Sequence, residues 1–244
     1  KVREMWSLFI KEVNAFFSNL SAYLITSVFL ISLGLIVWVF PGTSVLEYGY
    51  ADLEPLFSYT PFVFIFLLPA ITMRMVAEER KTGTWELLKT SPLNSSQIVI
   101  AKYFAALALL FFSLIPTLIY YFSIVQLGDT IGNIDSAGFF GAYIGLFLVG
   151  ALFASVGLFS SCITSNQIVS FVIAVFISFL LYGGIGAMAS LTSGDLAVLL
   201  EGLGTDFHYE QMGRGVIVSE NIYYFLGMIL TFLVCSWVLI NRDE

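Results

Sequence analysis

The chain has 244 residues, of which 59% are hydrophobic and only 11% carry a charge. Because soluble domains carry about 25% charged residues, this composition excludes an ordinary water-soluble protein and indicates one that lies in a membrane. The net charge of −7 gives no reason to expect a nucleic-acid partner.

The first 21 residues are predicted to form an amphipathic helix. Apolar side chains recur at helical spacing on one face, at Trp6, Phe9, Ile10, Val13, Phe16, Phe17 and Leu20. The remaining face is polar, with Arg3, Ser7, Lys11, Asn14 and Ser18. Beside a membrane span, such a helix is expected to lie in the cytoplasmic interface of the bilayer. A helix that packs on a soluble partner protein remains the alternative.

Six long apolar runs without any charged residue follow, at 22–40, 56–73, 103–127, 139–163, 168–188 and 222–240. Each run has about 18 residues or more, which suffices for a helix that crosses a hydrocarbon core of roughly 30 Å. Backbone polar groups in lipid must be paired within their own segment, so such runs form helices. The predicted fold is therefore all-α: a single transmembrane domain over 1–244 with six transmembrane helices.

The basic residues outside these runs predict the orientation. Nine of them fall on one side of the membrane, at Lys1, Arg3, Lys11, Arg74, Arg80, Lys81, Lys89, Lys102 and Arg242. The tenth, Arg214, lies in the loop before the last run, among acidic residues. Since loops rich in Lys and Arg stay in the cytoplasm, both termini and the loop 74–102 are predicted to be cytoplasmic.

The loop 74–102 is predicted to contain two short helical segments. Arg74 and Glu78 are four residues apart, which favours a charged extension of the second transmembrane helix. Gly83 is a natural end for that extension, because glycine adopts the left-handed conformation that closes helices. Thr84 can cap a second short helix over 85–89, with Glu86 in the first turn, where the helix dipole favours an anion.

This second short helix is followed by a new helix start. Pro92 ends the short helix, and Asn94 with Gln97 forms a capping-box pattern that begins the third span. The short helix carries Trp85, Leu87 and Leu88, which are unusual side chains to expose to the cytosol. They are expected to contact a partner protein or the membrane surface. A helix that lies at the interface without a partner remains open.

Two later regions carry candidate residues for packing and for the outer surface. Gly141 and Gly145 form a small-xxx-small pair in the fourth run, which permits close helix approach. The outer loop 189–221 contains a short apolar stretch, 196–200, which predicts a re-entrant or interfacial helix. Further along this loop, Arg214 is expected to pair with Glu210, near His208, and to hold the outer helix against the sixth span. Contact of Arg214 with a partner or cargo is the alternative.

Other classes of membrane protein can be weighed directly. A secondary transporter keeps ionisable residues inside its spans, and none of the six apolar runs contains one. His208 is the single histidine and lies in the outer loop, so no enzyme site is apparent, and no catalytic residue, metal or cofactor is expected in this chain. No phosphate-binding loop of the G-x-x-x-x-G-K-[ST] type occurs, so ATP must bind elsewhere. A scaffold that assembles other envelope proteins, or transmits force to them, stays open.

The segment from Met73 to Lys102 resembles the signature of ABC-2 type transporter permeases. It reads Met-Arg-x-x-x-Glu-Glu-Arg-Lys-x-Gly-Thr-x-Glu-Leu-Leu-x-x-x-Pro-Leu, and then continues to the lysine. The stretches 128–135, 166–169 and 208–217 are similar to the F-type permease subunits of the gliding-motility-associated (Gld) ABC transporters. The resemblance covers nearly the whole chain.

The resemblance implies a permease subunit of the bacterial inner membrane that a separate ATPase drives. In this family the segment corresponding to 84–89 is a coupling helix that docks in a cleft of the ATPase, where ATP and Mg²⁺ bind. The residues expected at this interface are Glu78, Glu79, Arg80, Lys81, Gly83, Thr84, Trp85, Glu86, Leu87 and Leu88. Since six spans make half a transporter, a second permease is expected, either a different chain (a G subunit) or an identical copy. The expected complex is an exporter linked to gliding motility or the cell envelope.

Overall fold

The computed structural model describes residues 2–48, 52–128, 135–213 and 218–242. Within these ranges every regular element is helical, as predicted. The elements are α1 (Val2–Phe17), α2 (Leu20–Trp38), α3 (Val45–Tyr48), α4 (Glu54–Thr72), α5 (Ala77–Thr82), α6 (Thr84–Lys89), α7 (Ser95–Leu114), η1 (Ile115–Thr117), α8 (Leu118–Leu127), α9 (Ser136–Ile163), α10 (Gln167–Phe179), η2 (Leu180–Gly184), α11 (Ile185–Ser190), α12 (Asp195–Glu201), α13 (Thr205–Gly213) and α14 (Ser219–Arg242).

Five segments of the described chain are long and apolar enough to cross a membrane. They are Glu54–Thr82, Ser95–Leu127, Ser136–Ile163, Gln167–Ser190 and Ser219–Arg242. A sixth is reached if α1 and α2, which meet at a bend of 69°, are counted as one span. The structure is thus a polytopic helical membrane protein with five or six candidate spans. The bend separates α1 from α2 in the region where the sequence predicts the change from amphipathic to fully apolar helix.

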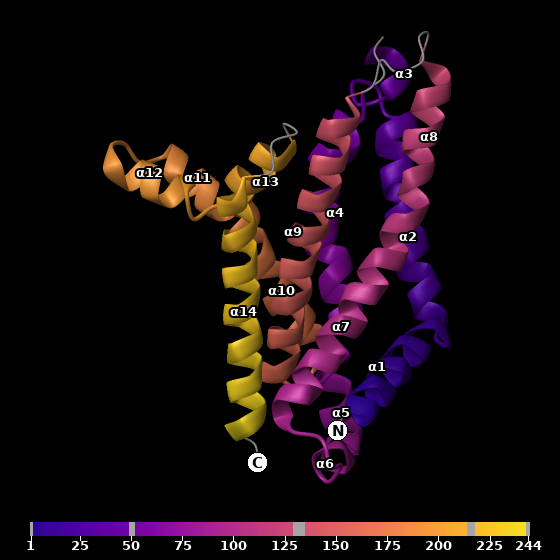
Figure 1. Cartoon of the computed structure of the whole chain (residues 1–244), viewed down its shortest axis with the longest axis vertical. Coiled ribbons are helices and arrows are strands. Elements are labelled where there is room, and N and C mark those ends of the chain that lie inside the picture. The colour runs from indigo at the N-terminus through magenta and orange to yellow at the C-terminus, as the bar shows by residue number, and fades with distance from the viewer. Residues whose placement is uncertain (1, 49–51, 129–134, 214–217, 243–244) are drawn as a thin grey trace.

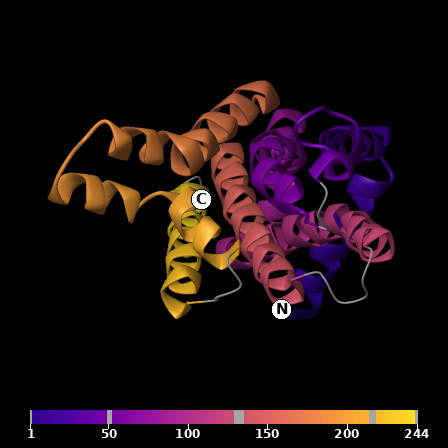
Figure 2. The ribbon, with the colours of Figure 1, turned by 90° about the horizontal axis from the view of Figure 1, so that it is seen from above.

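Helix α9 forms the centre of the molecule, and α4, α7, α10, α13 and α14 pack on it (Figures 1 and 2). All residues of α9 from 149 to 158 are buried. By contrast, α14 leaves large apolar side chains such as Leu226, Leu230 and Trp237 exposed. Such a face suits lipid or a second subunit, because apolar patches of this size are rare on water-exposed surfaces.

Glycines on α9 permit close contacts with helices of the same chain. Gly141 is buried in α9. A methyl group added to Gly145 would lie 3.1 Å from Cδ2 of Tyr209, which is a residue of α13. The same addition at Gly157 would lie 2.9 Å from Cβ of Thr72 in α4. The small residues of α9 therefore serve packing within the chain, and Gly145 packs against α13.

The prolines and glycines within the long helices affect them differently. Helix α4 continues through Pro61 and Pro69, whereas Pro116 lies in the 3₁₀ turn η1, between α7 and α8. The glycines of the fifth apolar run do not end the helix, since Gly183 and Gly184 form part of the π-helical segment η2, which leads into α11. A π-helix accommodates an extra residue without leaving backbone groups unpaired.

The two ends of the bundle differ in charge. We call the end that carries α5, α6 and the last turn of α14 the basic end, and the end that carries α3, α12 and α13 the acidic end (Figure 1). The described residues of the acidic end include no Lys or Arg. Helices α11 and α12 project sideways from the body there (Figure 1), and α12, the predicted interfacial helix, has no buried residue.

Candidate functional site

The α5–α6 segment (77–89) lies at the tip of the basic end, where the sequence predicts two short helices. Gly83 separates them with φ 77°, a left-handed conformation that suits glycine. The predicted cap is shifted by one residue, because Gly83 is the N-cap of α6 and Thr84 is its first residue. The capping box of Asn94 and Gln97 is present, and α7 begins at Ser95.

The N-terminus of α5 is held by the central helix. The backbone N–H groups of Val76 and Ala77 each donate to Oγ of Ser161, at 3.0 Å. That hydroxyl donates in turn to the carbonyl of Met73 at 3.2 Å. One serine of α9 therefore satisfies backbone groups at the break between α4 and α5, which would otherwise be buried without partners.

Arg80 and Trp85 join α5 to α6 and to α9. The guanidinium of Arg80 donates to the carbonyl of Cys162 at 2.6 Å and lies 5.6 Å from the centre of the Trp85 ring. Trp85 is only 3% exposed. The sequence predicts Trp85 and Arg80 as contacts to a partner; in the structure Trp85 is buried, Arg80 is partly buried, and both contact this chain itself.

The remaining predicted residues of the segment divide into two groups. Glu78, Lys81, Gly83, Thr84, Glu86 and Leu87 are exposed, whereas Glu79 and Leu88 are partly buried. Leu87 is 72% exposed, the most conspicuous apolar side chain at this tip. An exposed leucine between charged neighbours is a surface that a partner can cover.

Four charged side chains from three helices meet behind the α5–α6 segment. We call Lys11 and Glu12 of α1, Glu79 of α5 and Lys102 of α7 the charge cluster. Nζ of Lys102 lies 2.8 Å from a carboxylate oxygen of Glu12 and 2.8 Å from one of Glu79. Nζ of Lys11 lies 3.3 Å from Glu79. The side chain of Lys102 is fully buried, and those of Glu12 and Glu79 are 13% and 14% exposed.

The position of Lys102 corrects the sequence analysis. The loop does not extend to residue 102, because α7 begins at Ser95, and Lys102 lies two turns inside a candidate span. The candidate span therefore begins with a segment that contains Lys102 and continues into the uncharged run 103–127. The capping box of Asn94 and Gln97, from which the sequence predicts the helix start, places Lys102 seven residues into the helix. The pairing with Glu12 has no comparable signal.

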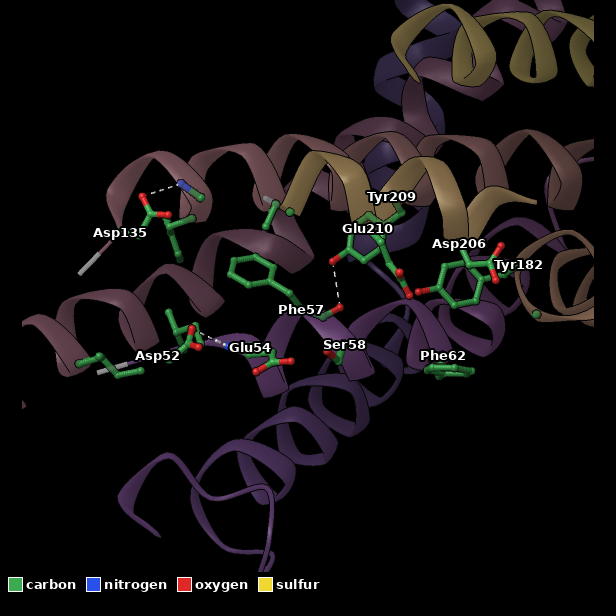
Figure 3. Close-up of a pocket in the computed structure, with 17 residues that line it drawn as sticks. Asp52, Glu54, Phe57, Ser58, Phe62, Asp135, Tyr182, Asp206, Tyr209 and Glu210 are labelled. Atoms are coloured by element: carbon green, nitrogen blue, oxygen red, sulfur yellow. Dashed lines mark hydrogen bonds between the residues drawn. The ribbon is translucent and has the colours of Figure 1, made fainter. Parts of the chain in front are cut away.

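The acidic end holds a cavity of about 970 Å³ between α4, α9, η2 and α13 (Figure 3). Its carboxylates are Asp52, Glu54, Asp135, Asp206 and Glu210, and its aromatic walls are Phe57, Phe62, Phe139, Tyr182 and Tyr209. The hydroxyl of Tyr209 donates to the carbonyl of Phe57 at 2.9 Å, which ties α13 to α4. Burial raises the pKa of Tyr209 well above its usual value, so this hydroxyl keeps its proton.

Of the predicted outer-loop residues, the structure describes His208 and Glu210, which have different neighbours. His208 lies 2.8 Å through Nδ1 from the amide oxygen of Asn221 and 2.9 Å through Nε2 from the carbonyl of Gly202. Its ring stacks on Tyr224, with centroids 4.0 Å apart. Glu210 is exposed at the cavity. Arg214 lies outside the described residues, so its predicted pairing with Glu210 stays a prediction. Over the described ranges, no group of three or more His, Cys, Asp or Glu side chains is arranged to hold a metal ion.

The family model of ABC-2 family transporter proteins matches residues 41–240, which is most of the chain. This protein therefore belongs to the ABC-2 transporter family. No curated protein matches the chain. Proteins of this family are the membrane subunits of ABC transporters, so the chain is a permease subunit that works in a complex with an ATPase.

Proposed function

We propose that the chain is a permease subunit of an exporter-type ABC-2 complex, and that the ATPase docks on the tip of the α5–α6 segment. The observation that carries this proposal is the contrast within α6. Trp85 is buried and anchors the helix to the chain itself, whereas Leu87, two residues on, is 72% exposed. A short helix that is fixed from behind and carries an apolar side chain in front is suited to fill a cleft of a partner.

The exposed charges around Leu87 suit the rim of such an interface. Glu78, Lys81 and Glu86 carry charges of both signs on the same tip. Rim charges act on orientation and association rate more than on affinity. In this proposal the basic end faces the cytoplasm, with both termini on that side of a bacterial inner membrane.

The finer assignment of the complex rests on sequence resemblance. Similarity to F-type permeases of gliding-motility transporters supports a link to gliding motility or to envelope machinery. The same similarity favours a second permease of a different kind, a G subunit, over an identical copy. The exposed apolar face of α14 offers a surface that such a subunit can cover.

Replacement of Leu87 by Asp tests the docking proposal. The new carboxylate would be buried in an apolar cleft without a partner, at a cost of about 3 kcal/mol, which lowers ATPase affinity about a hundredfold. The measurement is retention of the ATPase subunit on the purified permease in mild detergent, followed by ATP turnover of the reconstituted complex. The permease itself should keep its thermal stability, because Leu87 is exposed.

Arg242→Asp is the matched control, since it adds a carboxylate at the exposed end of α14 on the same side of the bundle. It should leave ATPase retention unchanged. Wild-type retention by the Leu87→Asp protein would exclude α6 as the docking element. A permease that binds an ATPase but moves no cargo under any condition would favour the scaffold or force-transmitting alternative.

A further inference from the structure

The charge cluster joins three parts of the bundle at one nitrogen atom. The ammonium of Lys102 donates hydrogen bonds to Glu12 of α1 and to the carbonyl of Met75 at the break between α4 and α5, and it forms an ion pair with Glu79 of α5. The two lysines and two glutamates of the cluster give no net charge. The charge of this buried ammonium is therefore balanced by the two carboxylates that it contacts.

A buried ion pair is a poor choice for stability alone. Removing charged groups from water costs more than their attraction reliably returns, and apolar side chains of similar volume hold helices together at least as well. An ion pair instead restricts geometry, because the ammonium must lie within contact distance of groups on three segments: Glu12, Glu79 and the carbonyl of Met75. The cluster thus fixes where α5 lies relative to α1 and α7.

The helices joined at Lys102 lead away from the α5–α6 segment in two directions. Helix α7 continues through η1 into α8, whose Ile124 lines the cavity at the acidic end. Helix α1 leads through its 69° bend into α2. On the side of the segment, Arg80 and Trp85 join α5 to α6, so the two short helices form one unit. A displacement of α6 is therefore passed to Glu79 and from there to Lys102.

A second cavity provides room for such a displacement. It has a volume of about 400 Å³ and lies between α1 and the α5–α6 segment, beside the charge cluster. Lys11, Glu12 and Glu79 line it together with Arg74 and Glu78. Packed helices cannot move past each other without free volume, and this cavity leaves free volume between α5 and α1.

We propose that Lys102 is the positioning residue that transmits movement of the α5–α6 segment to α7 and α1. It contacts neither the ATPase nor cargo, and acts through Glu79 and Glu12. The inference rests on the proposed function, since it requires an ATPase that moves α6. In this arrangement the charge cluster connects the moving α5 to α1 and α7, and α7 and α8 carry the movement to the cavity at the acidic end.

The test separates docking from transmission. One spin label is placed at Leu127 of α8 and one at Tyr223 of α14, both exposed at the acidic end. The distance between them is measured by double electron–electron resonance in the reconstituted complex, with and without ATP. The test variant combines Glu12→Gln, Glu79→Gln and Lys102→Met, which removes the ion pairs without leaving an unpaired buried charge. It should retain the ATPase subunit as wild type does and lose the ATP-dependent change in distance.

The controls make each outcome decisive. Arg3→Met removes an exposed cation from the same helix α1 and should keep the full change in distance. An ATP-dependent change of wild-type size in the triple variant overturns the proposal. If the triple variant does not fold, Glu79→Gln alone, which breaks the ion pair between α5 and α7, must reduce the change, and an undiminished change again overturns the proposal. A wild-type complex that retains no ATPase refutes the proposed function itself, an outcome that the retention assay detects separately.

Discussion

The basic and acidic ends of this permease are built on different physical principles. At the basic end, Lys102, Glu79 and Arg80 connect α5 to α1, α7 and α9 through charged groups that are largely buried. At the acidic end, α13 is held by neutral hydrogen bonds, such as that from Tyr209 to Phe57, around a cavity of about 970 Å³. The charged connections restrict geometry where a partner docks, and the neutral contacts surround open volume. In the permease, buried charges therefore define the contacts between helices where movement enters, whereas neutral contacts surround the larger cavity at the far end.

The largest expected effect concerns which end faces the cytoplasm. Cysteines introduced at Asp52 and Asp195, both exposed at the acidic end, should react with a membrane-impermeant thiol reagent in intact cells. A cysteine at Lys81, exposed at the basic end, should react only after the cells are permeabilised. Labelling at position 81 in intact cells would reverse the orientation and remove the basic end from any cytoplasmic ATPase.

The next largest effect concerns the contribution of the charge cluster to the stability of the fold. Lys102→Met alone leaves Glu12 and Glu79 facing each other without a buried cation, which should destabilise the fold by about 3–5 kcal/mol. Thermal unfolding in detergent provides the measurement. The control is Lys11→Met, which removes the exposed cation of the same cluster and should cost less than about 1 kcal/mol. Equal losses of stability in the two variants would show that the buried Lys102 contributes no more to the fold than the exposed Lys11.

A pair of glycine substitutions compares packing along α9. Gly157→Ala brings a methyl group against Thr72, whose hydroxyl is already bonded to the carbonyl of Leu68, and should cost about 1–3 kcal/mol through overpacking. Gly145→Ala, nearer the acidic end, meets the Tyr209 ring at 3.1 Å, where a shift of a few tenths of an ångström suffices. It should have the smaller effect on the unfolding temperature. The reverse order would mean that the acidic end is the more rigid one.

The smallest effect is expected at the hydrogen bond of Tyr209. Tyr209→Phe removes the donor to the carbonyl of Phe57 and should destabilise α13 by about 1 kcal/mol. Tyr223→Phe is the matched control, because that side chain is 72% exposed. Hydrogen–deuterium exchange of residues 205–213 should rise in the first variant and stay unchanged in the second. Unaltered exchange in both would assign the position of α13 to apolar packing alone.

Local features of the fold were accessible from the sequence. Uncharged runs of sufficient length predict the helices that can span a membrane, because the cost of transferring charge into lipid acts on each segment separately. Gly83 and the pair Asn94 and Gln97 predict the ends of the short helices, since capping depends on residues within one turn. The segment at the tip of the basic end was identified in this way, together with the exposure of Leu87.

The tertiary structure alone decided which of these residues meet. Glu12, Glu79 and Lys102 are far apart along the chain, and no periodicity relates them, so their contact follows only from the packing of α1, α5 and α7. Trp85 shows the same limit: its spacing fits an exposed face as well as a buried one, and burial depends on the bundle behind it. Helix formation and membrane insertion are governed by neighbouring residues, whereas the pairing of buried charges requires the arrangement of the whole bundle.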